Sequence, residues 1–337
     1  MQIEHYDALL IQSFGGPEHQ DDVIPFLENV LRGRNVPRQR LLEVADHYRK
    51  FGGISPINQQ CRDLIAALKQ ELQTHHIDLP IYWGNRNWNP MLDATFQEMQ
   101  DHGVKRVLSF VTSAFSSYSG CRQYREDVIR FRSAVDADEI KVDKLRVFYN
   151  HPDFIEVVAD CVHQAIVALD LNHLPMVVFT AHSIPSGMAA ACDYEQQLRE
   201  SCSLVANHLD LPTDKWALVY QSRSGRPQDP WLDPDICDFI ETLHSQGICD
   251  LVLSPIGFIS DHMEVLFDLD TEARNVCERL NINMRRASTP GIHPQFIRMV
   301  RKLFQERLSG TEREAIGRFP ANHDVCPEDC CFSGRPA

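Results

Sequence analysis

Two residues with proton-transfer and metal-binding chemistry each follow a short apolar run. His182 comes directly after Met176–Ala181, and Glu264 comes five residues after Leu251–Ile259. An imidazole transfers protons or binds metals near neutral pH, and a carboxylate is a hard oxygen ligand. A lone histidine is more often an ordinary structural residue, so its position after an apolar run is what favours a functional reading. We predict a cleft with His182 on one side and Glu264 on the other.

Two further carboxylates follow Glu264 at a helical spacing. Asp268 and Glu272 lie four and eight residues beyond it, so on an α-helix the three side chains share one face. Like charges at this spacing repel each other by about 0.2–0.5 kcal/mol per pair. One interpretation is a solvated acidic face. The other is a row of oxygen ligands that conducts a cation or protons, and the start of the row beside His262 favours it.

The motifs of several other enzyme classes are missing. The chain contains no P-loop, no G-x-S-x-G and no H-E-x-x-H. Gly15 and Gly16 permit a tight turn and close approach of a ligand, but a structural turn explains them equally well. A base and a carboxylate without a nucleophile favour metal handling or proton abstraction over acyl or phosphoryl transfer.

Eight short apolar runs alternate with helical segments along the chain. The runs are Asp7–Phe14, Ile81–Asn85, Val104–Thr112, Leu145–Tyr149, Met176–Ala181, Trp216–Gln221, Leu251–Ile259 and Ile282–Ala287. Strands that alternate with helices predict an α/β protein with parallel sheets covered on both faces. The long separation of the first two runs favours two four-stranded sheets over one eight-stranded barrel. Ligands bind at the carboxyl ends of such strands, where His182 and Glu264 are expected.

The length of 337 residues predicts two domains and a tail. We expect an N-terminal α/β domain at 1–170, a C-terminal α/β domain at 171–310 and a cysteine-containing tail at 311–337. The helix Asp153–Leu169 should connect the domains, because its apolar residues recur at helical spacing. The last helix, near Pro294–Leu308, should pack back on one of them.

The bulk composition excludes several partners. The net charge of −14 disfavours nucleic acid, because phosphate binding requires a basic surface. No apolar run approaches the ~20 residues that a membrane-spanning helix needs. The first residues, MQIEHYDALL, lack the pattern of a signal peptide. We therefore expect a cytoplasmic protein without a membrane span.

Eleven cysteines are expected to be thiols or metal ligands in a reducing compartment. Three of them, Cys326, Cys330 and Cys331, fall within six residues near the C-terminus. Thiolates bind iron–sulfur clusters and also zinc. A tail without order is the alternative.

Four segments resemble ferrochelatases: FGGISPIN at 51–58, TAHSIP at 180–185, YQSRSG at 220–225 and SPIGFISDHMEVLFDLDTEA at 254–273. The likeness extends from Tyr6 to about Leu308. The resemblance implies two Rossmann-like domains that face a porphyrin cleft, each a four-stranded parallel sheet flanked by helices (the chelatase fold). It also implies a lyase of haem biosynthesis that takes Fe²⁺ as a substrate. His182 and Glu264 match the catalytic pair at the metal-insertion point, and Asp268 and Glu272 match an acidic ladder.

Further positions match porphyrin contacts of the family. By the resemblance, Ser55 and Tyr118 touch the porphyrin, and Arg32 and Tyr48 fall near positions that contact propionates. Phe14 stands where related enzymes carry a tyrosine that ligates the product iron. Phenylalanine has no donor atom, so ligation from this side is not expected.

YDALLIQSFGGPE, FLENVLRGRNVP, HYRKFGGISPIN and GNRNW resemble the actinobacterial-type branch, which makes haem through coproporphyrin. We expect insertion of Fe²⁺ into coproporphyrin III to form Fe-coproporphyrin III (coprohaem) by a monomer that passes its product to a coprohaem decarboxylase. The four arginines of Leu31–Arg40 suit a substrate with four propionates, although a solvated basic loop is an alternative. Two other hypotheses are a protoporphyrin IX ferrochelatase and a porphyrin or haem carrier without turnover.

Some members of that branch carry an iron–sulfur cluster on C-terminal cysteines. The resemblance therefore implies a [2Fe–2S] cluster on Cys326, Cys330 and Cys331. Such clusters take four thiolates. Cys161, on the connecting helix, is the expected fourth ligand, because the resembling enzymes draw one ligand from that region. A plain core residue is the alternative for Cys161.

Overall fold

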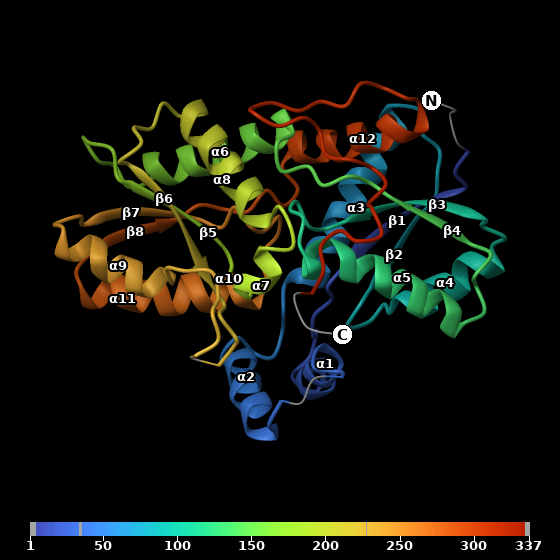
Figure 1. The fold of residues 1–337 in the computed structure, drawn as a ribbon, viewed down its shortest axis with the longest axis horizontal. Coiled ribbons are helices and arrows are strands. Elements are labelled where there is room, and N and C mark those ends of the chain that lie inside the picture. Colours follow the sequence, from blue (N-terminus) through green and yellow to red (C-terminus); the bar gives the residue numbers. More distant parts are fainter. Residues whose placement is uncertain (1–4, 34–35, 227, 334–337) are drawn as a thin grey trace.

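Two four-stranded parallel sheets form the framework of the protein in a computed structural model, which describes residues 5–33, 36–226 and 228–333 (Figure 1). The first sheet has the order β2-β1-β3-β4, with β1 Ala8–Ser13, β2 Ile81–Asn85, β3 Arg106–Val111 and β4 Lys141–Lys144. The second has the order β6-β5-β7-β8, with β5 Met176–His182, β6 Trp216–Gln221, β7 Asp250–Ser254 and β8 Asn283–Arg286. The predicted α/β class and the two separate sheets are confirmed. The domain boundaries at residues 170 and 310 stay predictions.

The two sheets repeat one topology. In each, the first strand in sequence is flanked by the second and the third, so β1 and β5 are interior strands. Every residue of β1 is buried, as is all of β5 except His182. Interior strands of parallel sheets are covered on both faces, which explains their unbroken apolar runs. The end of each interior strand therefore delivers a side chain to the carboxyl edge of its sheet.

Twelve α-helices surround the sheets in the described residues: α1 Val23–Val30, α2 Arg38–Lys50, α3 Ile57–Thr74, α4 Leu92–Asp101, α5 Gln123–Ala134, α6 Pro152–Val167, α7 Ser186–Ala189, α8 Tyr194–His208, α9 Ile236–Ser245, α10 Met263–Phe267, α11 Arg274–Arg279 and α12 Pro294–Leu308. Figure 1 shows α6, α8 and α12 above the sheets, with α9 and α11 below the second sheet and α4 and α5 below the first. None of the described helices is long and apolar enough to span a bilayer.

One continuous apolar core, which we call the shared core, joins the upper faces of both sheets. It contains Ile11 and Phe110 from the first sheet and Phe179 and Val252 from the second. Residues of α3, α6, α8 and α12 complete it. Separate smaller clusters fill the opposite face of each sheet. The two sheets are thus held together by packing on one side.

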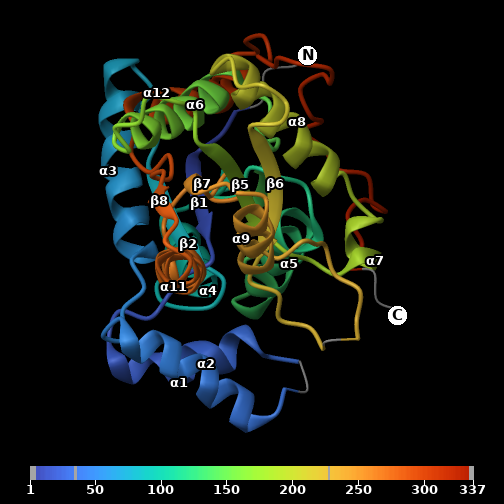
Figure 2. The same ribbon diagram turned by 90° about the vertical axis from the view of Figure 1, so that its left-hand side faces the viewer.

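A helical hairpin of α1 and α2 lies beneath both sheets (Figure 2). Its own small core contains Val23, Phe26 and Leu41, with Phe14 and Tyr48 packed against it. On α2 the ring of His47 stacks on Phe267, with 3.9 Å between the ring centroids and an interplanar angle of 12°. The hairpin therefore reaches from the first sheet to the end of α10.

The fourth predicted strand, Leu145–Tyr149, is wrong. β4 ends at Lys144, and the apolar run that follows it is irregular chain buried in the shared core. Only the backbone N–H of Leu145 continues the ladder, donating to the carbonyl of Ser109 at 2.8 Å. An apolar run reports burial and does not by itself report strand pairing.

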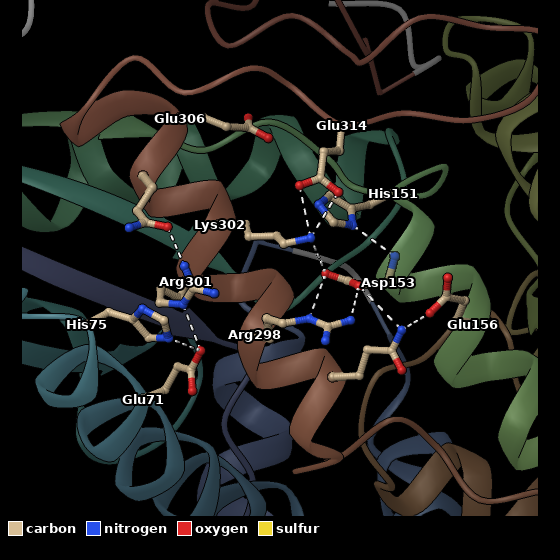
Figure 3. Close-up of polar contacts among 12 residues, drawn as sticks. Glu71, His75, His151, Asp153, Glu156, Arg298, Arg301, Lys302, Glu306 and Glu314 are labelled. Carbon is tan, nitrogen blue, oxygen red and sulfur yellow. Dashed lines mark hydrogen bonds and ion pairs between the residues drawn. The ribbon is translucent and has the colours of Figure 1, made fainter.

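Helix α12 is fastened to its neighbours by ion pairs (Figure 3). Arg301 binds Glu71 of α3 at 2.7 Å. Lys302 lies 2.9 Å from Asp153, at the start of α6, and 2.9 Å from Glu314 of the tail. The predicted packing of the last helix against the body of the protein is confirmed, and α12 connects both halves and the tail.

Candidate active site

The end of β5 fixes the backbone of His182. Its carbonyl accepts a hydrogen bond from the hydroxyl of Tyr194 at 3.1 Å. The next residue, Ser183, donates its N–H to the carbonyl of Gln221 on β6 at 2.8 Å. Gly257 packs so closely on Ala181 that an added Cβ would lie 2.8 Å from it. The imidazole is therefore held at a defined place on the strand edge.

Glu264 is positioned by the start of α10. The ring of His262 caps this helix, because its Nδ1 accepts the N–H of Glu264 at 3.2 Å. His182 Nε2 and Glu264 Oε1 lie 3.6 Å apart, and the two side chains are 31% and 46% exposed. The structure thus brings the two predicted residues together on a surface that solvent reaches.

Each member of this pair stabilises the charge of the other. Burial disfavours the imidazolium, but the field and hydrogen bond of Glu264 outweigh burial and raise the pKa of His182 to about 9. Burial likewise disfavours the carboxylate, but His182 lowers the pKa of Glu264 to about 2. At neutral pH the site holds an imidazolium–carboxylate pair. A cation that binds Glu264 would displace the proton of His182.

A π-helical segment, η3 (Asp268–Ala273), follows α10 and carries the rest of the acidic row. The prediction of one α-helix through Glu272 is therefore wrong in its local geometry. Four residues make slightly more than one turn of an α-helix, which has 3.6 residues per turn. They make slightly less than one turn of a π-helix, which is wider. The rotation of the side chains about the helix axis from Glu264 to Asp268 is therefore opposed by the rotation from Asp268 to Glu272, so the three stay on one side of the helix. π-Segments occur frequently at functional sites.

The end of β6 anchors Asp268. Ser222 Oγ donates to its carboxylate, and Gln221 Nε2 lies 3.4 Å from the same oxygen. Ser222 has a φ of +62°, a left-handed conformation that is uncommon for serine. Burial, opposed by the Ser222 hydrogen bond and supported by Glu264 and Glu272, raises the pKa of Asp268 to about 7. Asp268 can therefore hold or release a proton near neutral pH.

Tyr48 of α2 faces the same site from the hairpin. Burial and the charge of Glu264 both raise its pKa, so the phenol stays protonated. Its ring packs on Phe26, with 5.8 Å between the centroids. The phenol of Tyr48 therefore remains a hydrogen-bond donor within the field of Glu264.

The other predicted porphyrin contacts lie around the first sheet. Phe14 is half-buried, with its ring 6.2 Å from that of Phe26. Ser55 is buried, and its N–H donates to the carbonyl of Pro17 at 2.9 Å. Tyr118 begins the π-helical turn η2 (Tyr118–Arg122) and donates its hydroxyl to Glu126. Their contacts with a porphyrin stay predictions.

The arginines of Leu31–Arg40 that the structure describes are exposed. Arg32 donates to Asn29, Arg38 pairs with Glu28 at 2.7 Å, and Arg40 pairs with Glu43 at 3.0 Å. Arg34 lies outside the described residues. Exposed pairs contribute little stability, so these guanidinium groups can exchange partners for a ligand carboxylate at small cost.

The cysteine tail meets a residue that sequence reasoning missed. Cys121, in η2, forms thiol hydrogen bonds with Cys326 and Cys331, which lower its pKa. Cys330 lines the same cavity. Cys121 gives no sequence signal of its own, because its role depends on where the tail runs.

The structure does not place Cys161, the predicted fourth ligand, beside the tail cysteines; Cys121 lines the cavity with them instead. Cys161 is buried in the shared core on α6, where its hydrogen-bond partner is Ser288. Burial raises the pKa of its thiol, as in an ordinary core cysteine. Cys121 occupies the place beside the tail thiols that Cys161 was expected to fill.

Another group of donor side chains does not suit a metal. Donor atoms of His151, Asp153 and Glu314 lie within 4.8 Å of one another (Figure 3). However, the ammonium of Lys302 already pairs with both carboxylates, and the guanidinium of Arg298 pairs with Asp153 as well. His151 Nδ1 accepts the N–H of Asp153, so the neutral ring carries its proton on Nε2 and has no free lone pair there. We interpret this group as a structural ion-pair network.

Gln221 and Ser222 are site residues that sequence reasoning missed, although they carry an identifiable signal. Gln221 ends an apolar run and Ser222 follows it, in the manner of His182. The strand-end rule that selected His182 selects them as well.

The sequence profile of the family described as ferrochelatase matches residues 6–308. A protein of Rhodopirellula baltica named ferrochelatase is 55% identical, with 98% of this chain and 95% of the relative covered. A protein of Streptomyces griseus named coproporphyrin III ferrochelatase is 46% identical, with 98% and 94% covered.

Solved structures share the fold at low sequence identity. SirB from Bacillus subtilis with Fe³⁺ has a TM-score of 0.53 at 13% identity, with 91% of this chain and 97% of SirB covered. CbiX, described as the terminal enzyme of sirohaem biosynthesis in denitrifying bacteria, has a TM-score of 0.51 at 11% identity, with 90% and 100% covered.

Replacing Glu264 with glutamine should lower the pKa of His182 from about 9 to 6.5 or below. The carboxylate that stabilises the imidazolium is then absent, whereas burial, which disfavours it, remains. NMR titration of the His182 ring in histidine-labelled protein measures the midpoint. Glu272→Gln is the matched control and should leave the midpoint near 9. An unchanged midpoint in Glu264→Gln would contradict the pairing.

Proposed function

This chain belongs to the ferrochelatase family, and we propose that it inserts Fe²⁺ into coproporphyrin III to form Fe-coproporphyrin III (coprohaem). The observation that carries the proposal is the His182–Glu264 pair, 3.6 Å apart at the strand edge, with the acidic row of η3 behind it. The names of relatives at 46% identity support coproporphyrin as the substrate.

Metal insertion replaces the two pyrrole N–H protons of the porphyrin with Fe²⁺. The site must therefore accept protons and admit a ferrous ion. We assign iron delivery to Glu264 and proton acceptance to His182. An ion at Glu264 removes the charge that holds the proton on His182, and that proton leaves to the solvent that reaches the side chain. The neutral imidazole then accepts the two pyrrole protons one after the other and passes each of them to solvent. Positioned acid–base groups contribute ~10²–10⁴-fold to rate.

The acidic row supplies a route to this pair. Carboxylates that repel one another gain from sharing a cation, and both Asp268 and Glu272 have raised pKa values, with partial desolvation as the largest cause. Asp268, with a pKa of about 7, also exchanges protons at neutral pH. In our proposal these two residues relay cations or protons, and Glu264 contacts the porphyrin centre.

Substrate choice rests on the hairpin of α1 and α2. Arg32, Arg38 and Arg40 carry exposed guanidinium groups at its end, and Tyr48 faces Glu264. Coproporphyrin III has four propionates and protoporphyrin IX has two, so a cluster of cations favours the former. Protoporphyrin IX remains the second candidate substrate, because the relative at 55% identity is named ferrochelatase without a stated porphyrin.

We further propose that the protein acts as a monomer in the cytoplasm. Its product would pass to a coprohaem decarboxylase, the class of enzyme that consumes Fe-coproporphyrin III.

We also propose a [2Fe–2S] cluster on Cys121, Cys326, Cys330 and Cys331. Three of these thiols are joined by hydrogen bonds, and the fourth lines the same cavity. Arg122 donates to the carbonyl of Cys330 at 2.9 Å, which holds the tail against η2. The donor set fits a cluster that takes four thiolates. When bound, the group would link the tail covalently to the first half of the chain.

Catalytic efficiency should be higher with coproporphyrin III than with protoporphyrin IX in an anaerobic Fe²⁺ insertion assay. The double variant Arg32→Gln/Arg38→Gln should lose efficiency with coproporphyrin III by several-fold, because each exposed pair is worth about 0.2–1 kcal/mol. Arg279→Gln, an exposed arginine of α11, is the matched control. Equal or better efficiency with protoporphyrin IX in the wild type would favour the second candidate, and binding without turnover would favour a carrier.

Asp268→Asn combined with Glu272→Gln should raise the KM for Fe²⁺ by about tenfold or more, the usual scale for groups that support metal binding. The rate at saturating iron should change less, because His182 and Glu264 remain. Glu278→Gln, an exposed carboxylate of α11, is the control. If both KM and rate stay unchanged in the double variant, the row is only a solvated face.

Anaerobically purified or reconstituted protein should contain iron and acid-labile sulfide and show the visible spectrum of a [2Fe–2S] cluster. Cys121→Ser should abolish all three signals, because it removes the thiol that the tail cysteines contact. Cys161→Ser should retain them. Loss in Cys161→Ser but not in Cys121→Ser would restore Cys161 as the fourth ligand, and a colourless wild-type protein without sulfide would end the cluster proposal.

A further inference from the structure

The tail thiols border a cavity of about 420 Å³ to which both halves of the chain contribute. Cys121 and Lys144 belong to the first half, and Ala190–Asp193 belongs to the second. The latter stretch includes Cys192, a fifth cysteine of the cavity, which lies outside the ligand set proposed above. We call this cavity the cysteine pocket.

Cys192 lies on a loop that starts at the catalytic histidine. The loop leaves β5 at Ser183, forms the short helix α7 and returns at Tyr194, the first residue of α8. The hydroxyl of Tyr194 closes it by donating to the carbonyl of His182 at 3.1 Å. Cys192 and His182 thus lie on one loop that this hydrogen bond closes. Tyr194 follows Cys192 by two residues.

The thiol of Cys192 also supports the loop. It donates to the carbonyls of Met188 and Ala189 at 3.2 and 3.6 Å, at the end of α7. A helix of four residues is marginal without such contacts. When Cys192 itself binds a metal, its thiolate cannot donate this hydrogen bond, so occupation of Cys192 removes a contact that holds the end of α7.

Tyr194 is placed to carry that change. Its ring is buried and packs edge-on against Phe115, with 6.2 Å between the centroids. Movement of Ala190–Asp193 therefore displaces the tightly packed side chain of Tyr194. The hydroxyl of Tyr194 is hydrogen-bonded to the backbone carbonyl of His182, so the displacement reaches His182. Close-packed interiors transmit such shifts because they have few voids to absorb them.

We propose that the loop Ser183–Tyr194 couples the cysteine pocket to the active site, with Tyr194 as the positioning residue for His182. The inference rests on the proposed chelatase role of His182. Binding of a soft metal by pocket thiols that include Cys192 then changes the setting of the imidazole, so the state of the pocket regulates metal insertion.

The test uses Cd²⁺ alone, because soft cations prefer thiolates. Ultraviolet cadmium–thiolate absorbance reports loading, and the NMR signals of the His182 ring report coupling. In the wild type both should change together. In Tyr194→Phe the absorbance should be retained while the change at His182 is lost, because the ring remains and the hydroxyl is gone. No change at His182 in the wild type, or an equal change in Tyr194→Phe, would overturn the proposal.

Three cysteine variants complete the design. Cys121→Ser should lose both signals, and a persisting change at His182 would overturn the proposal by showing that Cd²⁺ binds the imidazole directly. Cys161→Ser, the matched control, should behave as the wild type, and loss of absorbance there would contradict the pocket assignment. Cys192→Ser serves if Tyr194→Phe does not fold. The Cys192→Ser variant should bind Cd²⁺ at least ~10-fold more weakly and should show no change in the His182 signals. If it behaves as the wild type, the proposal is overturned.

The two proposals can fail separately. The cadmium readouts need neither turnover nor a cluster, so a negative result leaves the ferrochelatase assignment standing. Conversely, wild-type protein that inserts no Fe²⁺ into either porphyrin would end the proposed function even if the pocket and His182 proved to be coupled.

Discussion

The shared core is the constraint on which the site depends. It joins the upper faces of both sheets, with Phe110 from the first and Phe179 from the second in one apolar cluster. Burial of apolar surface on this scale is the dominant favourable term in folding. Packing on this side therefore sets how the two sheets, and the strand ends that carry the site, lie relative to each other.

A buried ion pair also joins segments that pack in the shared core. Arg146 and Glu306 are almost fully buried and form two hydrogen bonds of 2.8 Å, which tie the chain after β4 to α12. Removing one partner of such a pair typically costs about 3–5 kcal/mol, because the other charge is left unpaired. The same helix binds α3 and the tail through Arg301 and Lys302. The tail is therefore part of the fold over much of its length, and it reaches η2 in an ordered path.

Electrostatics then divides the site into two parts. The pair of His182 and Glu264 is a stable ion pair, whereas Asp268 has a pKa of about 7 and sits on a π-segment held by a strained serine. In the proposed function, an arriving cation is the trigger that frees His182 to act as a base. The pKa of Asp268 lies near neutral pH, so this neighbouring carboxyl group exchanges protons readily.

The sequence by itself determined the two parallel sheets, the end of the strand that carries His182 and the helix Pro294–Leu308, together with the nearness of His182 to Glu264. Those features follow from local periodicity and from the rule that parallel strands end at one edge. Tertiary structure alone decided that Leu145–Tyr149 is buried coil, that the acidic row is partly π-helical and that Cys121 meets the tail. Each of these depends on how distant segments pack, and no pattern within a short stretch of residues carries that information.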